Sequence, residues 1–138
     1  MITNELMIFL KDKKIWFDDE SEDYKKSLLS LNISENSDIG YFYLHAEQNP
    51  NFISKNGELL QICWHAINTN YISNTENLKK ALDIPSSGII LSSFESGSGW
   101  FYDNATGKVH LNTPTNENTQ ETIEWDNFGN FLSYFFLN

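Results

Sequence analysis

The Gly-Ser-Gly run at residues 97–99 is the first place in this chain where spacing suggests chemistry. A serine among glycines is typical of nucleophile turns and of phosphate-binding loops. A nucleophile elbow needs glycine two residues to either side of its serine, and Ser96 and Trp100 occupy those positions around Ser98. The run also lacks the third glycine of a dinucleotide loop and the Gly-Lys pair of a P-loop. The spacing therefore predicts a backbone turn.

Cys63 and His65 would share one face of a strand, and His45 or Glu58 would be the further ligands of a metal site there. Zinc sites normally draw on tighter, paired spacings, so we predict no metal site. Cys63 is expected to pack in the core. His65 is expected to be either partly buried and hydrogen-bonded or exposed.

Residues 18–23, Asp-Asp-Glu-Ser-Glu-Asp, form the densest acidic run. A calcium-binding EF-hand loop requires glycine at its sixth position, which Asp23 occupies here. Two interpretations stay open. The carboxylates of Asp18, Asp19 and Glu22 either begin a solvated helix, where the helix dipole favours negative charge, or face a partner.

No arrangement of residues predicts catalysis. His110 lies beside Lys108 and has no serine, cysteine or carboxylate at an obvious distance along the chain. Glycoside chemistry depends on the separation of two carboxylates in space, and nothing in the sequence favours it. We therefore expect a protein that is not an enzyme and needs no cofactor.

The charge balance limits the class of partner. Lys+Arg total 9 against 19 for Asp+Glu, a net charge of −10. A phosphate backbone would meet like charge, so direct nucleic-acid binding is not expected, whereas basic partners would be attracted, including proteins that bind nucleic acid through Lys and Arg. Alternatively, the acidity serves only solubility.

Length, cysteine content and hydropathy predict one cytoplasmic domain spanning residues 1–138. The chain is long enough for one core, and its single cysteine rules out an intrachain disulfide. The first residues lack the basic and apolar regions of a secretory signal. The longest apolar stretches fall far short of the ~20 residues that span a bilayer, so no membrane anchor is expected.

Periodicity and turn residues predict both helices and strands. Helices are expected at residues 4–10, 20–30, 74–82 (capped by Ser73 or Asn74) and 126–137 (capped by Asp126). Strands are expected at residues 41–45, 58–68, 88–94, 100–103 and 108–111. The most apolar strand, 88–94, is expected at the centre of the sheet. Asn56-Gly57 is expected to form a turn, and residues 112–122 a surface loop.

The hairpin around residues 104–107 decides which aromatic side chains share a face. Asn104 suits the first position of a type I turn, and Gly107 suits the left-handed position after it. We favour a bulged turn that pairs Asn104 with Lys108, because Gly107 supplies the positive φ that a bulge needs. The bulge would place Phe101, Val109 and Leu111 on one face and Trp100, Tyr102 and His110 on the other. Without it, Trp100 and Tyr102 would join Val109 and Leu111.

The order of these elements resembles the SUKH superfamily. The similarity is carried by residues 77–85, Asn-Leu-Lys-Lys-Ala-Leu-Asp-Ile-Pro, and by residues 89–103, Ile-Ile-Leu-Ser-Ser-Phe-Glu-Ser-Gly-Ser-Gly-Trp-Phe-Tyr-Asp. A Gly-bearing turn, a Val strand and an aromatic C-terminal helix follow, as in that family. The resemblance implies an α+β fold: a twisted antiparallel sheet, here of about five to six strands, with two N-terminal helices, one short middle helix and a C-terminal helix. It also implies the absence of enzymatic activity.

For many bacterial members, the resemblance implies a cytoplasmic immunity protein that neutralises a cognate polymorphic toxin domain. The charge of this chain suggests that the toxin is a basic nuclease, whose substrate groove acidic side chains would block. The expected partner-binding residues are Glu95, Trp100, Tyr102, Asp103, His110, Asp18, Asp19 and Glu22. Trp100 and Tyr102 are either core residues or exposed anchors.

Two other functions remain open. One is a regulatory or scaffolding domain that binds host proteins, as eukaryotic relatives of the superfamily are thought to do. The other is a small-molecule or glycan-binding module that uses Trp100 and Tyr102 as a stacking surface. The protein is expected to be a monomer or a homodimer.

Overall fold

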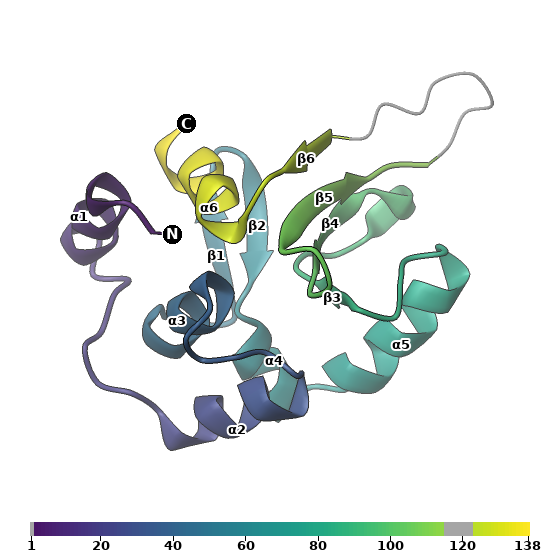
Figure 1. Ribbon diagram of the computed structural model, residues 1–138, viewed down its shortest axis with the longest axis horizontal. Coiled ribbons are helices and arrows are strands. Elements are labelled where there is room, and N and C mark those ends of the chain that lie inside the picture. Colours follow the sequence, from purple (N-terminus) through teal and green to yellow (C-terminus); the bar gives the residue numbers. More distant parts are fainter. Residues whose placement is uncertain (1, 115–122) are drawn as a thin grey trace.

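The computed structural model describes residues 2–114 and 123–138 and has mixed helix and sheet (Figure 1). Over these residues it contains six α-helices, a four-stranded antiparallel sheet and a separate two-stranded sheet. The α+β class is therefore as expected. The expectation of one continuous sheet is wrong, because the strands divide between two sheets. No helix in the described ranges is long and apolar enough to cross a membrane.

The two expected N-terminal helices are present as α1 (Asn4–Asp12) and α2 (Glu22–Ser30). Each begins at a hydroxyl cap: the Thr3 side chain accepts from the Leu6 N–H, and the Ser21 side chain accepts from the Tyr24 N–H. α2 begins two residues later than predicted, because Ser21 is its cap.

The expected strand at residues 41–45 is wrong, because these residues belong to helix α3 (Asp38–His45). Ser37 caps this helix by accepting from the Gly40 N–H at 3.1 Å. Gly40 is needed there, since a Cβ would lie 1.9 Å from the carbonyl oxygen of Ser34. All but two residues of α3 are buried. A short buried aromatic run has no polar face to reveal its period, so pattern alone does not separate helix from strand.

The expected strand at residues 58–68 is only partly correct. A hairpin joins β1 (Asn51–Ser54) to β2 (Gly57–Leu60). Its turn falls at Lys55 and Asn56, one residue earlier than the expected Asn56-Gly57 pair, and Gly57, at φ +128°, pairs with Ser54. The chain then enters helix α4 (Ile62–Asn68). Gln61 caps α4 through its side-chain oxygen, which accepts from the Cys63 N–H at 2.9 Å. The β1 strand was not predicted.

The middle helix is α5 (Tyr71–Ala81), which begins earlier than predicted, so neither Ser73 nor Asn74 caps it. It leads to β3 (Gly88–Ile90), β4 (Gly99–Asp103), β5 (Lys108–Asn112) and β6 (Ile123–Trp125), paired in that order. Residues 113 and 114 follow β5 outside any strand, and the rest of the expected surface loop, 115–122, lies outside the described residues. β6 was not predicted.

The apolar strand β3 is an edge strand of the sheet, which corrects the expectation of a central position. Its carbonyl groups are satisfied by side chains of α5: the Tyr71 hydroxyl donates to the Ile90 oxygen at 2.6 Å, and Lys79 Nζ donates to the Gly88 oxygen at 3.1 Å. Just beyond β3, the Leu60 N–H donates to the Leu91 oxygen, which joins the two sheets. β3 is therefore buried without a second neighbouring strand.

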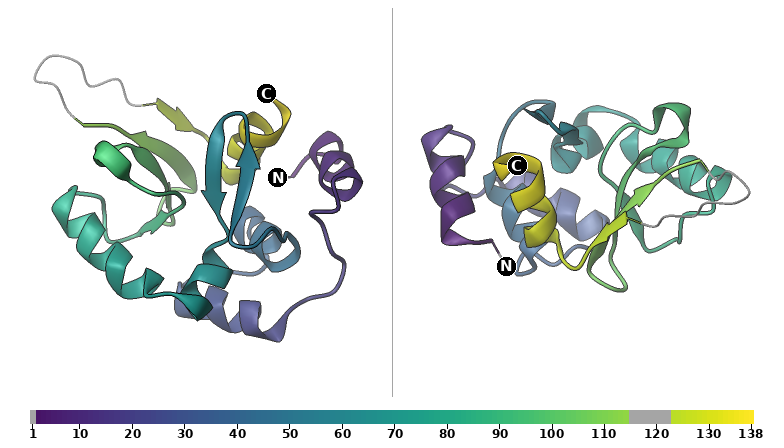
Figure 2. Two further views of the ribbon diagram at one scale, coloured as in Figure 1. Left: turned by 180° about the vertical axis from the view of Figure 1, so that it is seen from behind. Right: turned by 90° about the horizontal axis from the view of Figure 1, so that it is seen from above.

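The C-terminal helix α6 (Phe128–Leu137) packs against α1 and α3 on one side and against β5 and β6 on the other (Figures 1 and 2). Its cap is Asn127, whose Oδ1 accepts from the Asn130 N–H at 2.8 Å, and not Asp126 as predicted. The Asn56 amide in the β1–β2 turn donates to the carbonyl oxygens of Tyr134 at 2.9 Å and of Asn138 at 3.3 Å. The aromatic core therefore centres on α6.

The central aromatic packing gives a direct test of stability. Phe52 is fully buried, with ring centroids 5.1 Å from Phe42 and 6.1 Å from Phe136. We expect Phe52→Ala to lower the free energy of unfolding by about 3–5 kcal/mol in urea denaturation, because it leaves a cavity. The neighbouring Ile53 is 70% exposed, so Ile53→Ala should change it by less than about 0.5 kcal/mol. Equal losses in the two variants would contradict this packing.

Candidate functional site

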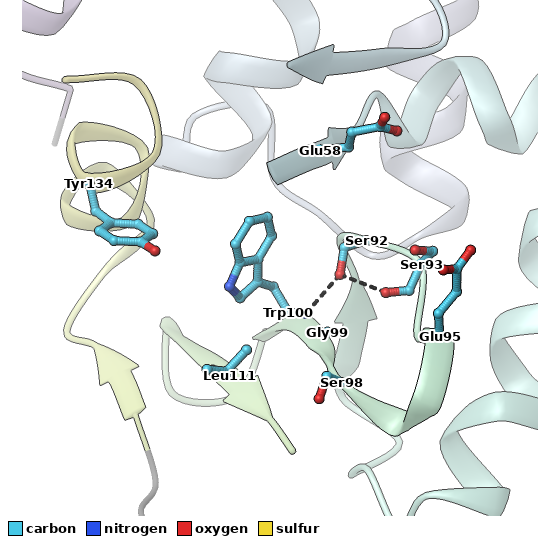
Figure 3. Close-up of a pocket in the computed structure, with 9 residues that line it drawn as sticks. All are labelled: Glu58, Ser92, Ser93, Glu95, Ser98, Gly99, Trp100, Leu111 and Tyr134. Carbon is cyan, nitrogen blue, oxygen red and sulfur yellow. Dashed lines mark hydrogen bonds between the residues drawn. The ribbon is translucent and has the colours of Figure 1, made fainter. Parts of the chain in front are cut away.

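A cleft of about 470 Å³ lies between the β1–β2 hairpin, the four-stranded sheet and α6 (Figure 3). Its lining residues are Glu58, Ser92, Ser93, Glu95, Ser98, Gly99, Trp100, Leu111 and Tyr134. In Figure 3, Trp100 lies between Tyr134 on one side and Glu58 and Glu95 on the other. The site therefore combines an aromatic centre with carboxylates and hydroxyl groups.

Trp100 is held rigidly, and only 8% of its surface is exposed. Its ring meets the Phe131 and Phe135 rings edge to face at 5.1 and 5.7 Å. A Cβ at Gly57 would lie 3.3 Å from the indole. Among the described residues, no acceptor binds the indole N–H, and no fully buried side-chain nitrogen or oxygen lacks a partner. The indole N–H is therefore solvent-accessible, at the cleft that Trp100 lines.

The wall beside Trp100 is fixed by Ser92 and Gly99. Ser92 Oγ accepts from the backbone N–H of Trp100 at 2.8 Å and donates to the Ser93 carbonyl at 3.1 Å. At Gly99, a Cβ would lie 2.6 Å from the Phe94 ring and 2.7 Å from the Ser93 oxygen. Any other residue at Gly99 would force these segments apart. The glycines of the 97–99 run thus serve the backbone, as the spacing predicted.

The register of the β4–β5 hairpin corrects the predicted turn. Trp100 pairs with Leu111 and Tyr102 with Val109, so these four side chains share a face, and the favoured bulge is absent. The turn begins one residue earlier than expected because Asp103 Oδ1 accepts from the Ala105 N–H at 2.9 Å. Gly107 has the expected positive φ, +79°.

This register places Tyr102 in the core. Tyr102 is 8% exposed, and its ring meets Phe128 edge to face at 6.0 Å. Burial, followed by the nearby charges of Asp38 and Asp103, raises the pKa of the Tyr102 hydroxyl. Of the two alternatives left open for Trp100 and Tyr102, the structure shows the core position for both, with Trp100 also lining the cleft.

Asp103 and His110 hold structural positions away from the cleft. Asp103 accepts from Ser87 Oγ at 2.7 Å in addition to its turn contact. His110 stacks on Phe101 with a centroid distance of 5.0 Å, and its Nδ1 lies 3.5 Å from a carboxylate oxygen of Glu124. Of the sequence-derived candidates in this half of the chain, only Glu95 and Trp100 line the cleft.

The other candidates lie on an acidic segment, residues 17–23, which runs from the connection after α1 into the first turn of α2 (Figure 1). Phe17 is 49% exposed, and Asp18, Asp19 and Glu22 are all exposed. Glu22 pairs with Lys25 at 3.5 Å, whereas the side chains of Asp18 and Asp19 make no ion pair with any described residue. The structure does not bring this segment together with the cleft, so the eight candidates do not form one site.

The acidic segment is anchored at both ends. The Phe17 N–H donates to the His45 carbonyl at 2.9 Å, and Glu20 pairs with Lys25 at 3.0 Å. A hydrogen bond from the Lys25 ammonium lowers the pKa of Glu20. The His45 ring completes the anchor, with Nδ1 2.7 Å from the Phe17 carbonyl and Nε2 3.3 Å from Glu20. Asp18 and Asp19 are therefore presented in a defined position.

From the sequence, His45 was weighed only as a possible zinc ligand, and its role in anchoring the acidic segment was not predicted. The ring stacks on Trp16 at 5.0 Å and 18° and lies 4.9 Å from Tyr41. Its two nitrogens face the Phe17 carbonyl and the Glu20 carboxylate, so the ring connects the two ends of the anchored stretch. A helix assigned to residues 38–45 would have placed Tyr41 and His45 one turn apart and revealed the cluster.

Cys63 and His65 lie on a helix, not on a strand face. Cys63 is fully buried, and burial raises the pKa of its thiol to about 12, so it is unreactive. His65 Nε2 lies 2.9 Å from Asn51 Oδ1, and partial burial lowers the pKa of the ring. Within residues 2–114 and 123–138, no group of three or more His, Cys, Asp and Glu side chains is placed to hold a metal ion.

The fold and these sites define an acidic α+β domain with an anchored carboxylate segment and a separate aromatic cleft. No family model, no curated protein and no solved structure matches this chain. Membership of the SUKH superfamily therefore stays a prediction from the residues.

The carboxylate of Glu47, behind the acidic segment, gives a pH-dependent test. Tyr24 donates its hydroxyl to Glu47 Oε1 at 2.5 Å, yet burial outweighs this bond and raises the pKa of Glu47. A raised folded-state pKa means that protonation stabilises the fold at low pH, and this contribution is lost as pH rises through it. Glu47→Gln removes the buried charge, so we expect its melting temperature to exceed that of the wild type at pH 7.

This difference between Glu47→Gln and the wild type should shrink as the pH falls toward 4, because the Glu47 carboxyl is then largely protonated in both the folded and the unfolded wild type. Glu35→Gln, on an exposed carboxylate, is the matched control. Thermal melts followed by circular dichroism across pH 4–8 would measure both variants. A lower melting temperature for Glu47→Gln at pH 7 would show that the hydrogen bond from Tyr24 outweighs the burial of charge.

Proposed function

We propose that this chain is an immunity protein that binds and neutralises a cognate toxin domain, acting in the cytoplasm by binding and without catalysis. The observation that carries the proposal is the anchored acidic segment, where exposed Phe17 precedes two carboxylates that no described cation neutralises. The family resemblance supports the same function.

The charge distribution indicates the kind of toxin. Residues 18–47 contain eight carboxylates and two lysines. Both are on α2, and Lys25 is already paired with Glu20 and Glu22. This concentration of negative charge suits a basic nuclease, whose substrate groove is lined by Lys and Arg. Carboxylates in that groove would take the positions of phosphates and block substrate entry.

The structure also supports fast and specific association. Anchoring of the segment by His45 and Lys25 reduces the conformational entropy lost on binding. The half-exposed ring of Phe17 offers an apolar contact beside the charges, of the kind that slows dissociation. The acidic segment therefore carries both the carboxylates that attract a basic partner and the Phe17 ring that would contact it.

The first experiment is co-expression in bacteria with the toxin domain encoded by the adjacent gene. We expect the toxin domain to kill cells when expressed alone and cells with this chain to survive. Killing that continues while this chain is soluble and abundant would end the proposal. Recovery of several unrelated partners from native lysate, in place of one toxin, would favour a scaffolding role.

Charge reversal tests the acidic segment directly. Asp18→Lys/Asp19→Lys should lower the association rate with the toxin domain about tenfold or more at low salt, with a smaller effect at high salt. Glu5→Lys/Asp12→Lys, the same change on exposed positions of α1, is the matched control. Stopped-flow fluorescence measures both rates. If the two variants slow association equally, only net charge matters and the segment is not the binding surface.

A further inference from the structure

The cleft has an unused hydrogen-bond donor on Trp100, whose indole nitrogen lies on the side of the ring toward Tyr134 and away from Glu58 and Glu95 (Figure 3). The Trp100 side chain is more than nine-tenths buried, yet its indole N–H has no acceptor among the described residues. Buried tryptophans normally pair this group, so an unpaired and accessible indole N–H suggests that an external acceptor completes it. A ligand at this site therefore carries an oxygen acceptor.

The rim of the cleft is negatively charged. Glu58 and Glu95 line it, and none of its described lining residues is basic. Glu58 is steadied by Asn51 Nδ2 at 3.1 Å, whereas Glu95 makes no ion pair with any described residue. With a net charge of −10 on the whole chain, the cleft favours a cation and disfavours an anionic ligand.

Size and chemistry together point to a segment of protein. A volume of about 470 Å³ is within the range of ligand pockets and exceeds what one side chain fills. A peptide segment supplies both required groups, a cationic side chain and a backbone carbonyl. Arginine fits better than lysine because its planar guanidinium is weakly hydrated, packs on aromatic rings and can pair with two carboxylates.

We propose that the cleft binds an arginine side chain presented by a loop of the partner protein. Its guanidinium pairs with the carboxylates of Glu58 and Glu95 against Trp100, and a neighbouring backbone carbonyl accepts from the indole N–H. This inference rests on the proposed function, since it names the side chain that the partner contributes. It also assigns the protein a second contact surface, separate from the acidic segment.

A blocked amino acid tests the cleft without the partner. The probe is N-acetyl-arginine-N′-methylamide, which carries one guanidinium and two carbonyl groups, and its control is the uncharged citrulline analogue. Nitrogen–proton NMR follows the indole N–H signals of the four tryptophans, with Trp100→Phe used to assign that of Trp100. We expect the arginine probe to shift the Trp100 signal in a saturable way and the citrulline probe to leave it in place.

Matched variants test the carboxylates. Glu58→Gln/Glu95→Gln should weaken binding of the arginine probe about tenfold or more, because both charged pairs are lost. Glu5→Gln/Glu35→Gln makes the same change in net charge at exposed positions outside the cleft and should leave the affinity unchanged. All four substitutions are on exposed side chains, so the variants should remain folded.

Three outcomes would overturn the inference. They are a Trp100 signal that does not respond to the arginine probe, an equal response to the citrulline probe, and an equal loss of affinity in the two double variants. A response to neutral methyl glycosides in place of arginine would assign the cleft to sugars. These results do not depend on toxin neutralisation. If this chain protects cells from the toxin but does not bind the arginine probe, the proposed function stands and the arginine site is ruled out.

Discussion

The buried side chain of Gln61 joins the elements on which the rest of the structure depends. It is fully buried, and its Nε2 donates to the carbonyl oxygens of Tyr43 at 3.1 Å and Ala46 at 2.7 Å, at the end of α3. Its Oε1 accepts from the Cys63 N–H at the start of α4. One amide therefore ends one helix, begins the next and fixes the β1–β2 hairpin between them. Because Gln61 is fully buried, losing its amide would remove the side-chain partner of three backbone groups away from solvent.

The aromatic side chains of α6 connect that junction to the four-stranded sheet. Phe128 and Phe136 contact the Phe42 ring on α3, while Phe131 and Phe135 contact Trp100 on β4. Because one helix packs on both parts, the hairpin and the sheet are held at a fixed separation, and the cleft lies between them. The acidic segment depends on the same core indirectly, through His45 at the end of α3.

The sequence predicted the elements whose signals are local. Capping residues and apolar spacing located α1, carboxylates ahead of an apolar run located α2, and the aromatic period located α6. It failed where tertiary contacts decide the structure. Residues 41–45 are buried on nearly all sides and carry no period, and Gln61 does not resemble a helix cap until its amide partners are known. The hairpin register was missed because either Asp103 or Asn104 could begin the turn.

The candidate site was predictable in the same partial way. Trp100 and Glu95 were expected to bind a partner because they lie in a glycine-rich aromatic run that stands out along the chain. Glu58 and Tyr134 line the same cleft but come from β2 and α6, and only the packing of those elements brings them to it. Tyr102 shares its strand face with Trp100 and is equally buried, but its ring packs on Phe128 and it does not line the cleft.

The hydrogen bonds from the Asn56 amide to the last carbonyl oxygens of α6 have a consequence for the cleft. They link the turn that precedes Glu58 to the helix that carries Tyr134, so the two sides of the opening move as one body. A ligand would therefore bind to a cleft whose width is already fixed in the folded protein, and induced fit would contribute little. Discrimination between ligands would then depend on how well each one fits this fixed shape.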